Sequence, residues 1–312
     1  MIKTVETVAP SATVAQGAGG WVSLHIFIHD FARLNAFVRA ALRSLPSEIS
    51  AQSFFIRYWY GGPHIRLRCR PLECRARVEA HLRDYLDANA FSSSLDPVEY
   101  YRAYARYLET EVPQHAATPD WFENGSIQVI PYLPEIDRYG GPNGMPLVEN
   151  YFVEDSGAVL RMLSDEPDRE LEKILFAHCV THAAVLREWN LELDHGPATL
   201  ALWPGARQSP NLAGAIREQA RTPARRSAYE RAQAAELFAR YQLPLRARLR
   251  ELVVRLRERG VREISQIISS LLHMSFNRTG IPPAREIIVR WLAAQCAAQA
   301  QPEESLLKRA DA

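Results

Sequence analysis

The segment from Ser53 to Arg70 constrains the fold most, because it has the pattern of two strands joined by a tight turn. Ser53–Tyr60 is rich in aromatic and β-branched residues, and Gly61-Gly62 is a two-residue turn signal. In the second strand, alternation predicts one basic face, formed by His64, Arg66, Arg68 and Arg70. It predicts an opposite apolar face, formed by Ile65, Leu67 and Cys69. We therefore expect a β-hairpin with its apolar face in the core.

The elements around this hairpin predict an α+β fold. Trp21–Ile28 and Ser126–Leu133 have strand patterns, whereas Phe31–Leu45 and Arg75–Ala88 have helical patterns. The order β-α-β-β-α-β indicates a ferredoxin-like antiparallel sheet, with an insertion at about 89–123 before its last strand.

From about residue 142 onward the strand patterns stop and helical patterns follow. They cover Leu147–Met162, Asp168–Trp189, Ala213–Arg240, Leu245–Arg259, Ile264–Asn277 and Arg285–Ala298. We therefore predict a sheet layer packed with a C-terminal helical bundle. The expected organisation is a disordered tail at 1–20, a sheet region at 21–141, a helical region at 142–300 that is compact with the sheet, and a tail at 301–312.

Composition excludes several classes of protein. No apolar run approaches the roughly 20 residues that a membrane span needs, and the first 20 residues lack the apolar core of a secretory signal. The four cysteines form no CxxC pair, which is typical of a reducing compartment. A formal net charge of +1 selects no nucleic-acid partner. We expect a cytoplasmic protein that binds neither membrane nor nucleic acid directly.

The basic face of the hairpin is the first candidate site. A two-residue turn at Gly61-Gly62 pairs Arg57 with Arg66, and like charges directly opposed on a sheet are destabilising. An anion on that face would remove the conflict, and arginine binds carboxylates in bidentate fashion. The alternative is a solvated cationic face without a ligand.

Two further segments carry candidate residues. Tyr132–Pro142 joins the last strand to the first helix of the bundle and contains Glu135 and Arg138, which could pair with each other or merely stabilise a connector. In the helix that begins at Ile264, His273 falls off the apolar stripe, with Asn277 one turn later to orient it. Such a histidine suits general acid or base catalysis, although a structural role is the alternative.

Two other patterns were weighed for metal and nucleic-acid binding. His178 and His182 have the i, i+4 spacing of a metal-binding pair, but Cys179 stands where HExxH has its glutamate. The Arg-rich helices between Arg217 and Arg262 could form a basic groove for RNA or an acidic peptide, but a solvated face is favoured. We expect no metal and no other cofactor.

Three sequence runs together resemble the C-terminal domain of lantibiotic dehydratases, whose stand-alone copies are thiopeptide-type bacteriocin biosynthesis proteins. The runs are FFIRYWYGGPHIRLRCR, YLPEIDRYGGPNGMPLVENYFVEDS and SLLHMSFNR. The resemblance extends from about Trp21 to Trp291. It implies that the chain expels glutamate from glutamylated Ser or Thr of a precursor peptide, which leaves dehydroalanine or dehydrobutyrine. A separate tRNA-Glu-dependent protein would first attach the glutamate.

The resemblance also implies roles for individual residues. Arg66 and Arg68 match the arginines that hold the glutamyl group, and Arg138 matches the arginine of the family's RYGG motif. His273 matches the proton-transfer residue of the family's late helix. From geometry alone we add supporting groups that contact the substrate: Arg57, Glu135, Asn277 and His64.

Two alternatives to the eliminase remain open, and a homodimer is possible. One alternative is a pyridine synthase, which joins two dehydroalanines in a formal [4+2] cycloaddition and releases the leader peptide. The other is a non-catalytic adaptor that pairs a leader peptide with an exposed sheet edge.

Overall fold

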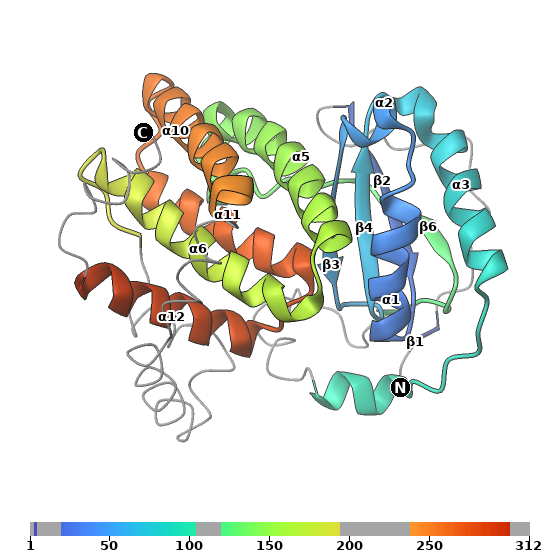
Figure 1. Ribbon diagram of the computed structural model, residues 1–312. Coiled ribbons are helices and arrows are strands. Elements are labelled where there is room, and N and C mark those ends of the chain that lie inside the picture. Colours follow the sequence, from blue (N-terminus) through green and yellow to red (C-terminus); the bar gives the residue numbers. More distant parts are fainter. Residues whose placement is uncertain (1–2, 5–19, 104–119, 194–237, 300–312) are drawn as a thin grey trace. The chain divides into compact units, whose positions relative to one another are not determined.

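A computed structural model describes residues 3–4, 20–103, 120–193 and 238–299 (Figure 1). The chain divides into two units, which are described one at a time. The first contains residues 1–167, 259–261 and 277–280, and the second contains 168–258, 262–276 and 281–312. The predicted tails lie almost wholly outside the described residues, as does most of the predicted helix Ala213–Arg240.

The first unit contains a four-stranded antiparallel sheet with the order β3-β4-β2-β6. Its strands are β2 (Val22–Phe27), β3 (Ser53–Tyr58), β4 (His64–Cys69) and β6 (Ile127–Val129). A short parallel pair joins β1 (Lys3–Thr4) to β5 (Asp120–Trp121). The ferredoxin-like strand order and the α+β class predicted from the sequence are confirmed.

The helices of this unit lie in the two crossover connections and after the sheet. They are α1 (Phe31–Phe37), which continues as the π-helix η2 (Val38–Leu42), α2 (Ser47–Ser50), η3 (Leu72–Cys74), α3 (Arg75–Ala88), η4 (Asp137–Tyr139) and α5 (Gly141–Asp165). Asp30 begins α1 because its carboxylate accepts a hydrogen bond from the backbone of Arg33. Phe37 and Tyr85 meet edge to face, which packs the first crossover against α3.

The register of the hairpin differs by one residue from the prediction. Arg57 lies opposite Ile65 and Ile56 lies opposite Arg66, so the predicted Arg57–Arg66 pair is wrong. A one-residue slip moves every side chain of a strand to the other face. Arg57 therefore does not share the face of Arg66.

The slip arises because residues 59–63 form a five-residue connection instead of a two-residue turn. The backbone N–H of Gly61 donates to the Tyr101 hydroxyl at 2.9 Å, and its carbonyl accepts from the backbone of Phe122 at 2.9 Å. A side chain at Gly62, where φ is +108°, would meet the His29 ring at 2.5 Å. Contacts distant in sequence thus hold the two glycines.

The outer edge of β3 is closed by side chains rather than by another strand. The backbone N–H of Phe55 donates to the Ser156 hydroxyl at 3.2 Å, and the carbonyl of Phe55 accepts from Arg278 Nε at 2.8 Å. The Arg278 guanidinium also donates to Asp155 at 2.7 Å, and both side chains are almost fully buried. These contacts join β3 to α5.

The second unit is helical among its described residues. It comprises α6 (Asp168–Arg187), the π-helix η6 (Phe238–Gln242), α10 (Leu243–Glu258), most of α11 (Ile264–Thr279) and α12 (Pro283–Gln299). Helix α6 packs against both α10 and α12. No helix in the described ranges is long and apolar enough to cross a membrane.

Candidate functional site

The basic face of the sheet exists, and part of it is buried. His64, Arg66 and Arg68 share this face of β4, as the alternation predicts. His25 of β2 lies opposite Arg66 in the neighbouring strand. Only 6% of Arg68, 5% of His25 and 1% of His64 are exposed. Arg66 and Arg70 keep intermediate exposure, so the solvated face that periodicity left open applies to these two arginines and not to Arg68.

Arg68 is a buried guanidinium without a carboxylate partner in the described part of the chain. Its Nη1 donates to the carbonyl of Arg66 at 3.4 Å, and its Nε has no hydrogen-bond partner. The guanidinium carbon lies 5.7 Å from the ring centre of Phe54 and 5.2 Å from that of Tyr132. Burial, followed by the charge of Arg66, lowers the pKa of Arg68 to about 9.

Arg66 is held in place by two aromatic rings. Its guanidinium carbon lies 3.3 Å from the ring centre of Tyr58, and its Nε donates to His64 Nε2 at 3.2 Å. Burial holds the pKa of His64 well below its ordinary value, so the ring is neutral. Its Nδ1 therefore donates to the carbonyl of Gly62 at 2.8 Å, while Nε2 accepts from Arg66. The structure thus places His64 behind Arg66 as an orienting group.

The connector before α5 lies in the same unit as this face. Arg138 and Glu135 form the ion pair that their spacing suggested, at 2.9 Å, with their side chains 44% and 61% exposed. The charge of Glu135 acts on Arg68 and raises its pKa, against the larger effect of burial. Tyr132 covers the guanidinium of Arg68. The structure therefore brings this connector and the basic face together.

Arg57 and Asn277 occupy different positions from those expected. The Arg57 guanidinium donates to the carbonyl of Arg278 at 3.0 Å and to Asn35 Oδ1 at 2.6 Å. Asn277 binds the backbone of Arg57 through both atoms of its side-chain amide, not the ring of His273. The orienting role expected for Asn277 is therefore wrong, because helical spacing alone did not reveal the edge of β3 as its partner.

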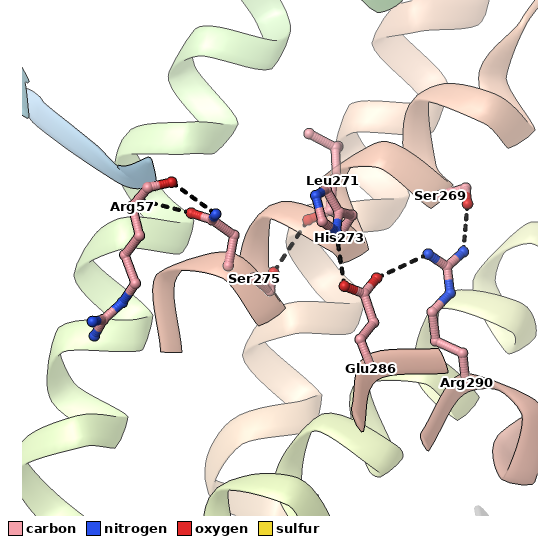
Figure 2. A network of polar contacts seen from close by, with 8 residues as sticks. Arg57, Ser269, Leu271, His273, Ser275, Glu286 and Arg290 are labelled. Atoms are coloured by element: carbon pink, nitrogen blue, oxygen red, sulfur yellow. Dashed lines mark hydrogen bonds and ion pairs between the residues drawn. The ribbon is translucent and has the colours of Figure 1, made fainter. Parts of the chain in front are cut away.

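In the second unit, His273 belongs to a chain of polar contacts that sequence reasoning missed (Figure 2). Its Nδ1 lies 2.7 Å from Glu286 Oε2, and Glu286 Oε1 lies 3.1 Å from Arg290 Nη1. Arg290 also donates to the Ser269 hydroxyl. The one available signal was the i, i+4 spacing of Glu286 and Arg290, which lies within an otherwise apolar stretch of α12.

Metal ligation has no support in the described residues. No group of three His, Cys, Asp or Glu side chains there lies close enough to hold an ion. His178 and His182 are buried in α6, and His182 Nδ1 lies 2.7 Å from the carbonyl of His178.

Comparison with known proteins places the chain in a family. A family model described as "Lantibiotic biosynthesis dehydratase C-term" matches residues 21–297. The chain matches none of the curated proteins. Among solved structures, it is 20% identical to the pyridine synthase TbtD from thiomuracin biosynthesis, with a TM-score of 0.65 over 90% of this chain and 98% of that one. At this identity the likeness shows a shared fold.

Two other solved structures match at lower TM-scores. The tRNA-dependent lantibiotic dehydratase MibB from Microbispora sp. 107891 is 18% identical, with a TM-score of 0.49 over 97% of this chain and 29% of that chain. TsrL is 16% identical, with a TM-score of 0.44 over 88% of this chain and 93% of that one.

Proposed function

The chain belongs to the lantibiotic dehydratase C-terminal family, and within that family we propose that it eliminates glutamate from glutamylated Ser and Thr side chains of a ribosomally made precursor peptide. The products are dehydroalanine and dehydrobutyrine. The observation that carries this proposal is the burial of the Arg68 guanidinium, which has no carboxylate partner in the described ranges of the chain.

Other buried arginines show why Arg68 points to an anionic substrate. Arg278 contacts the carboxylate of Asp155 at 2.7 Å, and Arg290 contacts that of Glu286 at 3.1 Å. An uncompensated buried charge is strongly destabilising, so natural chains pair such groups. In Arg68 the matching anion is missing from the described chain. A substrate carboxylate would supply it.

The chemistry of elimination uses such a cation directly. A base removes the Cα proton, that electron pair forms the Cα=Cβ bond, and the Cβ–O bond breaks as glutamate leaves with the bonding pair. Arg68, with Arg66 and Arg138, stabilises the carboxylate charge that develops on the leaving group. His273 transfers the proton. Glu135 and His64 support the arginines, whereas the structure supplies no reason to keep Arg57 or Asn277 in contact with substrate.

The proposal implies partners. The peptide substrate carries a leader, and a separate tRNA-Glu-dependent protein attaches the glutamate before this chain acts. The reaction needs no cofactor, because proton transfer and charge stabilisation suffice. We place this reaction in the cytoplasm, without direct nucleic-acid contact, and include a homodimer as a possible assembly.

Pyridine synthesis is the second candidate, because the fold covers nearly the full length of the thiomuracin pyridine synthase. That cycloaddition releases no glutamate, and so it gives Arg68 no ligand. For the adaptor alternative, side chains already occupy the backbone groups of Phe55 and Arg57, so a leader peptide could not pair with the β3 edge at these two residues.

Intact mass spectrometry separates the candidates. A Ser-glutamylated precursor peptide is incubated with this protein and, in parallel, with His273→Ala. Loss of glutamate to give a dehydro residue, abolished in the variant, supports the eliminase. A glutamyl ester that survives, while a fully dehydrated peptide loses water and its leader, contradicts it in favour of the pyridine synthase. Peptide binding without any conversion supports the adaptor instead.

A further inference from the structure

Glu286 lies between an imidazole and a guanidinium, and each of its carboxylate oxygens contacts one of them (Figure 2). Oε2 faces His273 Nδ1 at 2.7 Å and Oε1 faces Arg290 Nη1 at 3.1 Å. The Glu286 side chain is 1% exposed and that of Arg290 is 4% exposed, whereas His273 keeps 23% exposure. The buried end of this chain of contacts is therefore fixed, and its imidazole end reaches the surface of the second unit.

This arrangement determines which nitrogen of His273 carries a proton. An ionised carboxylate only accepts hydrogen bonds, so Nδ1 must donate to Glu286. In the neutral ring the lone pair is then on Nε2. Arg290 is itself tied to Ser269, one helical turn before His273 in α11. The carboxylate therefore cannot exchange its two oxygens without breaking a charge-assisted contact.

We propose that Glu286, held by Arg290, is a positioning residue that fixes the His273 tautomer and makes Nε2 the atom that takes the Cα proton. The inference rests on the proposed elimination and deepens it, since it assigns His273 the role of base. As Nε2 accepts the proton, the Cα–H electron pair forms the double bond and glutamate departs. The imidazolium that results lies against the Glu286 carboxylate, which stabilises it.

The decisive variant is Glu286→Gln, which keeps the shape and removes the charge. Arg290 can only donate, so it selects the amide oxygen, and the amide NH₂ group then faces His273 Nδ1. The ring must accept there, and its proton moves to Nε2. We expect long-range ¹H–¹⁵N spectra of histidine-labelled protein, with His273 assigned by His273→Asn, to show the switched tautomer. We expect elimination to slow by about two to four decades, as an inverted tautomer does elsewhere.

A double variant separates positioning from simple structural damage. In Glu286→Gln combined with Arg290→Met, no guanidinium competes for the amide oxygen, which can turn back toward His273 Nδ1. We expect the original tautomer to return and elimination to recover at least about tenfold over Glu286→Gln alone. The matched control is Glu172→Gln, which removes the charge from the exposed pair with Arg285 and should leave both readouts unchanged.

The outcomes distinguish this inference from the proposed function. An unchanged tautomer in Glu286→Gln, or a double variant as slow as the single one, overturns the positioning role of Glu286. If the wild-type protein does not convert a glutamylated peptide, the proposed function fails. The His273 tautomers of the wild type and of Glu286→Gln then still test the contact between Glu286 and His273 Nδ1. A switched tautomer with an unaltered rate overturns the assignment of Nε2 as the base.

Discussion

Asn277 binds both backbone polar groups of Arg57: it accepts from the N–H at 2.8 Å and donates to the carbonyl at 2.9 Å. These are the two bonds that a residue of a neighbouring strand would make. The last turn of α11 thus substitutes for a fifth strand at this point of the β3 edge. Asn277 therefore has a structural role at the β3 edge in place of the orienting role that its helical spacing suggested.

Replacing Asn277 should therefore destabilise the first unit. In Asn277→Asp the carboxylate can still accept from the Arg57 N–H but cannot donate to its carbonyl. We expect a loss of about 1–3 kcal/mol in the free energy of unfolding, measured by chemical denaturation. Asn150→Ala, which removes an exposed bond to Arg70, should change stability by less than about 0.5 kcal/mol. Equal effects of the two substitutions would contradict the strand-like role.

Substitution by methionine should lower the free energy of unfolding at Arg278 but not at Arg68. Arg278→Met leaves Asp155 buried and uncompensated, so we expect a loss of about 3–5 kcal/mol. Arg68→Met removes a buried cation that has no carboxylate partner among the residues that the structure describes, so the free energy of unfolding should stay equal or rise. Denaturation curves of the two variants check this contrast. A strongly destabilised Arg68→Met would show that the cation has a structural counter-charge in the free protein.

The same Arg68→Met variant should lose catalysis. A charge-assisted contact contributes roughly 1.5–3 kcal/mol, so elimination should slow by about one to two decades. Free glutamate should raise the melting temperature of the wild type but not that of the variant, because only the wild type has the Arg68 guanidinium, which lacks a carboxylate partner in the described part of the chain. Unchanged elimination in both Arg66→Ala and Arg68→Met would remove this face from the site.

Stability should fall in acid because of His178. Burial, followed by the charge of Arg248, lowers the pKa of its imidazole to about 3, and only 5% of the residue is exposed. The unfolded chain takes up this proton below about pH 6.5 while the folded chain does not. The stabilising effect of the neutral ring is thus complete above that pH and is lost toward pH 3, at about 1.4 kcal/mol per pH unit.

The check is a comparison of the wild type with His178→Leu at pH 7.5 and pH 5. The difference in unfolding free energy between the two proteins should change by about 2 kcal/mol, with the wild type losing more in acid. Other buried histidines, such as His29, contribute equally to both proteins and cancel. A constant difference between the proteins would mean that His178 takes up its proton as readily in the folded state as in the unfolded chain.

Much of the secondary structure followed from periodicity, because these patterns report local burial. The helix Arg75–Ala88 was predicted with the bounds that the structure shows, and α6 and α11 begin where the sequence indicated. Helix α5 begins six residues earlier than its pattern, since the run that starts at Gly141 has few apolar residues to mark it. Periodicity therefore identified each of these four helices, but it placed the first residue correctly only where apolar residues mark the start of the helix.

The site was harder to predict, because its contacts join distant residues. The register of the hairpin depends on Gly61 binding Tyr101 and Phe122, which no turn rule contains. The partner of His273 is Glu286, thirteen residues away on another helix, whereas spacing suggested Asn277. Alternation did predict the shared face of Arg66 and Arg68, but not its burial.

Arg68 has no carboxylate partner among the described residues, and this has a consequence for anyone who engineers this protein. A library of variants screened only for thermal stability favours any substitution that removes a buried charge without a partner. Residues that are retained for function often lower the stability of the folded protein, and such a screen replaces them. Such a screen would soon select variants with an apolar residue at position 68. We expect these variants to be thermostable but to have lost the proposed elimination activity. Each round of selection for thermal stability should therefore also select for turnover of the peptide substrate.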